Sequence, residues 1–112
     1  MQQNDIVGSA ALVFSDLPKE EGEAWVKKFV THSGVSFGNK LTNAGYKDIP
    51  VSYLFCEQDK TIPPANQREG IDMIEKVSGK KVDVTSIPTG HCPNVSAHQK
   101  VVDWFLDVAG KA

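Results

Sequence analysis

The pattern of hydrophobic and polar positions follows helical spacing in the first part of the chain and alternates between strand and helix spacing after residue 50. Apolar side chains at Trp25, Val26, Phe29 and Val30 recur every three to four residues, as on one face of an amphipathic helix. This spacing predicts a helix over residues 17–32. A second, shorter helix is expected over residues 36–44.

Residues near both ends of the first predicted helix carry the usual terminal signals. Asp16 is of the type that caps a helix N-terminus, and Glu20 favours the positive end of the helix dipole. Gly34 is expected to end the helix in a left-handed conformation. Residues 9–14, SAALVF, are short and apolar and fit either a strand or a helix.

The second part of the chain reads as strand, helix, strand, helix. Residues 51–56 are apolar on both faces, which is typical of a strand in a parallel sheet. A helix is expected from Pro63 or Pro64 to Ser78, ended by Gly79, and residues 81–88 alternate as a second strand. A last helix should begin at Asn94 or Ser96 and end at Gly110. This order predicts an α/β protein with a parallel sheet, and two strands alone would leave that sheet incomplete.

The periodicity also predicts which side chains the helices bury. The expected inward positions are Ile71, Ile74 and Val77 in one helix, and Val101, Phe105, Val108 and Ala109 in the last. We expect Trp25 and Trp104 to anchor the core, and His32 and His98 to lie exposed on helix surfaces.

Length and composition place the chain among ordinary globular domains and exclude several classes. The 112 residues fit one domain, 40% are hydrophobic and 23% charged, and the net charge of −2 makes nucleic acid an improbable partner. No apolar run approaches the roughly 20 residues that span a bilayer, so no membrane segment is expected. The N-terminus lacks the positive region of a signal peptide, and Cys56 and Cys92 are interpreted as reduced thiols, so a cytoplasmic location is expected.

Two polar side chains follow the two predicted strands at equivalent points. Asp59 lies just beyond the first strand, on a turn stiffened by Pro63 and Pro64, and His91 lies just beyond the second. Carboxyl ends of parallel strands meet at one edge of a sheet, where functional groups collect. A carboxylate that accepts a hydrogen bond from a histidine ring fixes its tautomer and stabilises its protonated form. We therefore expect Asp59 and His91 to form an acid–histidine pair.

Structural roles are the alternatives for these residues. Asp59 can cap the following helix, and His91, between Gly90 and Cys92, can simply close a turn. A metal site at Asp59, His91 and Cys92 is disfavoured because no paired cysteine or histidine spacing accompanies it, and neither a metal nor a cofactor is expected. Cys92 as a nucleophile beside His91 is disfavoured because adjacent side chains on one turn usually diverge.

Three stretches of the sequence are similar to the C-terminal portion of α/β-hydrolases, particularly a fungal, esterase-like branch: FSDLPKEEGEAWV, YKDIPVSYLFCEQDKTIPPANQ and IPTGHCP. The likeness extends from about residue 12 almost to the end of the chain. It implies one domain over residues 1–112, with a lid-like helical segment at about 9–47 and a C-terminal core portion at 48–112. It also implies that Asp59 is the catalytic acid and His91 the general base.

That family also requires a nucleophile on a strand-to-helix elbow with the pattern G-x-S-x-G. The pattern occurs at Gly34-Val35-Ser36-Phe37-Gly38, but the preceding residues have helical periodicity and only 22 residues separate Ser36 from Asp59. A helix C-cap at Gly34 followed by an N-cap at Ser36 is the preferred interpretation. The resemblance places the true elbow upstream of the lid, outside this chain.

Three functions stay open from the sequence. The first is a fragment or split half of a hydrolase for a small ester or related carbonyl compound, inactive as an isolated chain. The second is a non-catalytic remnant that binds an apolar ligand or assembles with another chain. The third is a minimal serine hydrolase that uses Ser36. A truncated sheet leaves an unpaired edge and an uncovered apolar face, so a homo-oligomer or a partner chain is expected.

Overall fold

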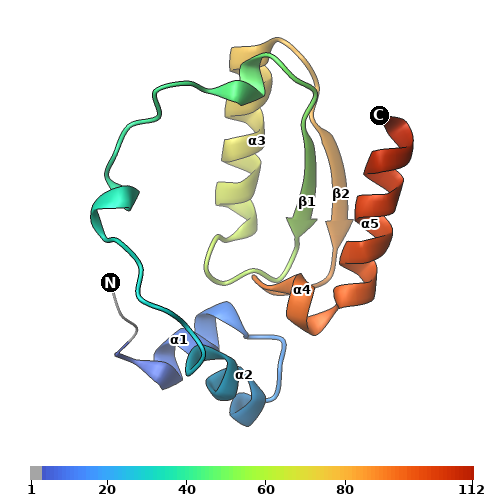
Figure 1. Cartoon of the computed structure of the whole chain (residues 1–112). Helices are drawn as coiled ribbons and strands as arrows, with labels where there is room; N and C mark the ends of the chain where they lie inside the picture. The colour runs from blue at the N-terminus through green and yellow to red at the C-terminus, as the bar shows by residue number, and fades with distance from the viewer. Residues whose placement is uncertain (1–3) are drawn as a thin grey trace.

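The computed structural model describes residues 4–112, which form helices around one pair of strands (Figure 1). In chain order the elements are α1 (Ile6–Val13), α2 (Lys19–Val26), the 3₁₀ helices η1 (Val35–Phe37) and η2 (Gly45–Lys47), β1 (Ser52–Cys56), α3 (Pro64–Ser78), β2 (Asp83–Ile87), α4 (Pro93–Ser96) and α5 (His98–Lys111). Apolar residues 9–14, which fitted a strand or a helix, lie mostly within α1.

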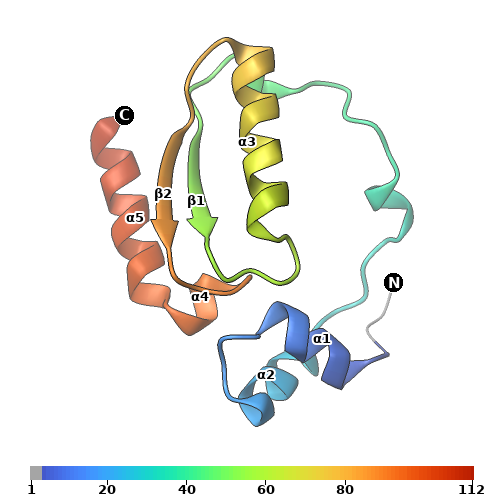
Figure 2. The same cartoon turned by 180° about the vertical axis from the view of Figure 1, so that it is seen from behind.

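The two strands pair in parallel, with Ser52 opposite Asp83 and Cys56 opposite Ile87. Helix α3 connects them, and both views show α3 and α5 on opposite sides of the pair (Figures 1 and 2). Side-chain contacts agree with this arrangement, because Phe55 lies 5.6 Å from the Arg68 guanidinium of α3. The predicted mixed α/β architecture with a parallel sheet is confirmed within the described residues.

Helix α3 matches its prediction closely at both ends. Pro64 occupies the first turn, where its missing N–H costs no hydrogen bond, and Gly79 ends the helix with a φ of 70°. Ile71 is completely buried, as expected. The prediction for Val77 is wrong, because this residue, in the last turn of α3, is 47% exposed.

The prediction of one long helix over residues 17–32 is wrong. Helix α2 stops at Val26, and Val30 is exposed in the connection that follows. Beyond Val26, Phe29 packs against the buried cluster, with its ring 5.9 Å from that of Phe14. Isolated helical turns are marginal in water unless tertiary packing stabilises them, so the helix ends where its burial ends. Trp25 is 36% exposed, so it is not the expected core anchor.

Three further predictions for the first half are also wrong. Asp16 does not cap α2, because Pro18 occupies the N-cap position and the Asp16 carboxylate is used elsewhere. Gly34 has a φ of −65°, which is right-handed. Residues 36–44 contain only the end of η1, and their large apolar side chains, Phe37 and Leu41, are mostly exposed, so little burial stabilises a helix there.

The last helical region is divided into α4 and α5 at Ala97, and α5 continues through Gly110 to Lys111. Its sheet-facing side includes Trp104, which lines a shallow pocket with Leu54 and Thr85 of the strands. Phe105 and Ala109 were expected to face inward, but both are exposed. Only one side of α5 contacts the two-stranded sheet, so the apolar stripe on its other side remains exposed to solvent. Its members are Val102, Phe105, Leu106 and Ala109.

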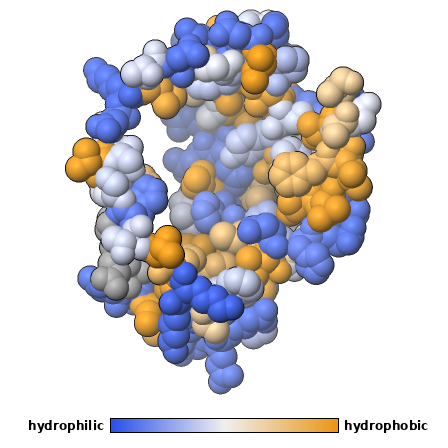
Figure 3. All heavy atoms as spheres, viewed as in Figure 1, coloured by the Kyte–Doolittle hydropathy of each residue, from blue (hydrophilic) through white to orange (hydrophobic). Residues whose placement is uncertain are grey.

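The main cluster of buried apolar side chains lies away from the sheet, between α1, α2 and the region of α4. Ala10, Phe14 and Val26 form its centre, and Cys92 and Val95 pack against it. The radius of gyration is 15.7 Å, above the roughly 13 Å expected for a compact chain of this length. The exposed apolar stripe of α5 forms a hydrophobic surface in the space-filling view (Figure 3). No described helix combines the length and apolarity needed to cross a membrane.

Ile71→Ala should destabilise the fold by about 2–5 kcal/mol, because it opens a cavity beneath α3 where no solvent reaches. Met73→Ala, on the exposed side of the same helix, is the matched control and should change the free energy of unfolding by less than about 1 kcal/mol. Urea denaturation followed by circular dichroism measures both. Equal losses in the two variants would contradict the placement of α3.

Candidate active site

Asp59 occupies the turn between β1 and α3, and its carboxylate organises that turn. Oδ1 accepts hydrogen bonds from the backbone N–H groups of Thr61 at 2.8 Å and Ile62 at 2.9 Å. The side chain is only 6% exposed. These two donors fix the orientation of the carboxylate and leave Oδ2 directed toward the loop that follows β2.

His91 lies on that second loop and meets the carboxylate directly. Its Nδ1 is 2.9 Å from Asp59 Oδ2, so the contact is a hydrogen bond in which the ring nitrogen donates to the carboxylate. This tautomer leaves Nε2 with a free lone pair, and among residues 4–112 no hydrogen bond to Nε2 is found. The His91 side chain is 29% exposed, so the ring is partly open to the surroundings. The structure thus brings together the two residues that the sequence singled out.

Gln67 holds the Asp59 turn from the side of α3 and is buried. Its Oε1 accepts from the Cys56 N–H at 3.0 Å, and its Nε2 donates to the carbonyls of Cys56 at 2.8 Å and Ile62 at 2.9 Å. The amide therefore pairs with the outer edge of β1 where a further strand would otherwise lie. The sequence signal was available but unused: Gln67 is a polar residue four positions before Ile71, on the same buried stripe.

Asp16 holds the His91 loop from the side of the α1–α2 hairpin. Its Oδ2 accepts from the Gly90 N–H at 2.8 Å and from the Ser96 hydroxyl at 2.6 Å. A side chain at Gly90 would place Cβ 2.8 Å from Asp16 Oδ1, so only glycine permits this close approach. Residues 74 positions apart are joined here, which local sequence patterns could not reveal.

The two cysteines are close to this site, but neither has the properties of a nucleophile. Burial raises the pKa of the Cys92 thiol, and the nearby carboxylates of Asp59 and Asp16 raise it further. Burial likewise raises the pKa of Cys56. Thiolate is the reactive form, so both thiols are less nucleophilic at neutral pH than free cysteine.

Metal ligation has no geometric support in the part of the chain that the structure describes. No group of three or more histidine, cysteine or acidic side chains is arranged to hold an ion there. Asp59 and His91 instead use their facing atoms on each other.

Ser36 is not brought to His91. It lies in η1, and its hydroxyl donates to the carbonyl of Ser33 at 2.7 Å. No strand precedes it in the described chain, and both views place η1 in the long connection away from the carboxyl ends of β1 and β2. The expected N-cap role of Ser36 is also wrong, because no helix over residues 36–44 follows it.

The chain is similar to the protein "Probable hydrolase R7" of Phoma sp. (strain ATCC 20986 / MF5453), with 40% identity over 106 residues. The match covers 95% of this chain but 43% of that relative, so the chain spans less than half of the relative's length. No family model matches the chain.

Cys92 should react slowly with iodoacetamide at pH 7–8, because its raised pKa keeps the thiol protonated, and the rate should climb only in more alkaline solution. Mass spectrometry of the Cys92 peptide over a pH series measures the apparent pKa, with the urea-unfolded chain as control. An apparent pKa below that of the unfolded chain would contradict this prediction and would restore Cys92 as a candidate nucleophile.

Proposed function

We propose that this chain is the C-terminal portion of an α/β-hydrolase that acts on a small ester or related carbonyl compound. The observation that carries the proposal is the contact between Asp59 Oδ2 and His91 Nδ1, at 2.9 Å, at the carboxyl ends of two parallel strands. The similarity to a protein named as a probable hydrolase supports the same reaction class.

In the proposed mechanism Asp59 orients His91 and stabilises the imidazolium that forms during the reaction. Nε2 accepts the proton of an attacking hydroxyl group, and the protonated ring then returns that proton to the leaving alcohol. Burial of the carboxylate strengthens its interaction with the ring, because little water competes for Oδ2.

The nucleophile and the oxyanion hole are assigned to residues outside these 112 positions. Ser36 already donates to a local carbonyl, and the described chain has no strand-to-helix elbow around it. A relative more than twice as long as this chain has ample length for both elements. An acid–base pair without them contributes only about 10²–10⁴-fold, so the isolated chain should be nearly inert.

A chimaera tests this proposal: the region of the Phoma relative that aligns with this chain is replaced by the present sequence. The chimaera should hydrolyse a small activated ester, and His91→Ala and Asp59→Ala should each lower kcat by at least about 10²-fold through loss of the base or its orientation. Steady-state rates with a chromogenic ester measure the effect.

His98→Ala and Ser36→Ala are the matched controls in the chimaera, because both residues are exposed and neither contacts the proposed pair. Both should retain full activity. If the isolated chain instead gives an acyl-enzyme burst that Ser36→Ala abolishes, the nucleophile lies within the chain and the assignment is wrong.

Association with another chain is the second candidate function, favoured by the exposed stripe of α5. Phe105 is 61% and Leu106 68% exposed on a helix whose opposite side already contacts the strands. The outer edge of β1 at Ser52 and Leu54 also faces no other strand within the described chain. Contiguous exposed apolar surface and unpaired strand edges are features of interaction surfaces.

Sedimentation velocity at micromolar concentration should therefore show a homo-oligomer. The double substitution Phe105→Glu with Leu106→Glu should shift the chain to monomer, because buried carboxylates at this surface would lose their hydration. The control Asn66→Glu adds a negative charge at an exposed position of α3 and should leave the oligomer intact. A monomeric unsubstituted chain would refute self-association.

A further inference from the structure

The α1–α2 hairpin is hydrogen-bonded to the loop that carries His91. Asp16, between the two helices of the hairpin, accepts at Oδ2 from the Gly90 N–H at 2.8 Å and from the Ser96 hydroxyl at 2.6 Å. Gly90 directly precedes His91 in the chain, and Ser96 is the last residue of α4. One carboxylate oxygen therefore holds the loop both before and after the histidine.

The contact with Asp16 begins where the strand pairing ends. Backbone pairing of the two strands continues past β2 as far as the Thr89 carbonyl, which accepts from the Gln58 N–H at 3.0 Å. The next N–H along the loop, that of Gly90, donates to the Asp16 side chain instead. In both views the hairpin lies beyond the carboxyl ends of β1 and β2 (Figures 1 and 2). The position of His91 therefore depends on the hairpin as well as on the sheet.

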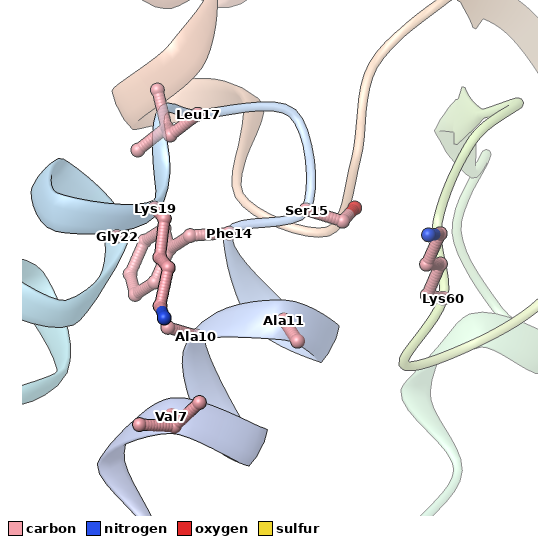
Figure 4. Close-up of a pocket in the computed structure, with 9 residues that line it drawn as sticks. All are labelled: Val7, Ala10, Ala11, Phe14, Ser15, Leu17, Lys19, Gly22 and Lys60. Atoms are coloured by element: carbon pink, nitrogen blue, oxygen red, sulfur yellow. The ribbon is translucent and has the colours of Figure 1, made fainter.

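The same hairpin is also hydrogen-bonded to the acid turn. The Thr61 hydroxyl donates to the Leu12 carbonyl of α1 at 3.1 Å, while the Thr61 N–H donates to Asp59 Oδ1 at 2.8 Å. The hairpin and the turn are not closely packed, because a pocket of about 280 Å³ lies between them, lined by Ser15 on one side and Lys60 on the other (Figure 4). A hydrogen bond rather than close packing therefore ties α1 to the acid turn.

We propose that Asp16 is a positioning residue for His91, and that the hairpin acts as a clamp on the Asp59–His91 pair. Asp16 acts through the Gly90 N–H: by fixing the backbone before the histidine, it keeps Nδ1 directed at Asp59 Oδ2 and keeps Nε2 in place. Small displacements of a catalytic group lower reaction rates strongly. The inference rests on the proposed function, since this alignment serves catalysis only if Nε2 transfers a proton.

The test follows the Nδ1 proton of His91, identified by a low-field proton NMR signal that is lost in His91→Gln. Its rate of exchange with water in the full isotope-labelled chain reports how often the ring leaves Asp59. Asp16→Ala should raise this rate about three- to tenfold, less than the loss of a buried charged hydrogen bond would, because Asp16 is exposed. Asp16→Asn should restore the original rate, since an amide oxygen at the same position can accept from both donors.

Two further variants separate positioning from a general loss of stability. Asp5→Ala removes the N-cap of α1, where Asp5 accepts from the Gly8 N–H at 2.9 Å, and should leave the exchange rate unchanged although it destabilises the hairpin. Thr61→Val removes the second tie but keeps the N–H that binds Asp59, and should raise the rate about two- to threefold. Far-UV dichroism checks that each variant is folded.

The proposal is overturned if Asp16→Ala leaves the exchange rate unchanged, or if Asp5→Ala raises the rate as much as Asp16→Ala does. If Asp16→Ala does not fold, Thr61→Val decides: an unchanged rate in that variant refutes the clamp, and a raised rate supports it.

The chimaera with the Phoma relative separates this inference from the proposed function. There Asp16→Ala should lower kcat by about three- to tenfold and leave KM unchanged, with recovery in Asp16→Asn. An active chimaera in which Asp16→Ala changes neither kcat nor the exchange rate refutes the role of Asp16 and leaves the proposed hydrolysis in place. An inactive chimaera, with the expected exchange rates in the isolated chain, refutes the hydrolysis and upholds the positioning of His91 by Asp16.

Discussion

The in-register parallel pairing of β1 and β2 is the constraint on which the rest of the structure depends. It places the carboxyl ends of both strands at one edge, so the turn after Cys56 and the loop after Ile87 emerge side by side. The Glu57 N–H continues the pairing to the Ile87 carbonyl, and the Gln58 N–H reaches the Thr89 carbonyl, both at 3.0 Å. Because the backbone is joined this far, Asp59 and His91 come within 2.9 Å of each other.

Two polar side chains, Gln67 and Asp16, extend this constraint to the helices. Gln67 ties the Asp59 turn to α3, and Asp16 ties the His91 loop to the α1–α2 hairpin. Buried polar groups are costly unless they are hydrogen-bonded, and the buried Gln67 amide meets this requirement through the backbone groups of the Asp59 turn. The exposed Asp16 carboxylate fixes the Gly90 N–H of the His91 loop. The same hairpin supplies most of the buried apolar cluster.

The chain also shows surfaces that its own residues do not cover. The two-stranded sheet covers only one side of α5, and the apolar stripe on the other side, with Phe105 and Leu106, stays exposed. The long connection between α2 and β1 packs on little and raises the radius of gyration above that of a compact domain. An acid–histidine pair on such a scaffold agrees with the proposal that a further part of a hydrolase completes it, since the pair alone lacks a nucleophile.

The sequence by itself determined the elements whose signals are local: the strand before Glu57, the helix between Pro64 and Gly79, and the position of Asp59 and His91 beyond their strands. Periodicity and terminal residues suffice there because each element is stabilised where its pattern lies. Only the tertiary structure decided the length of α2, the exposed side of α5, and the use of Asp16 on Gly90 rather than as a cap. Those outcomes depend on which surfaces meet across long sequence separations. An apolar stripe records a capacity for burial but does not specify the partner that would bury it.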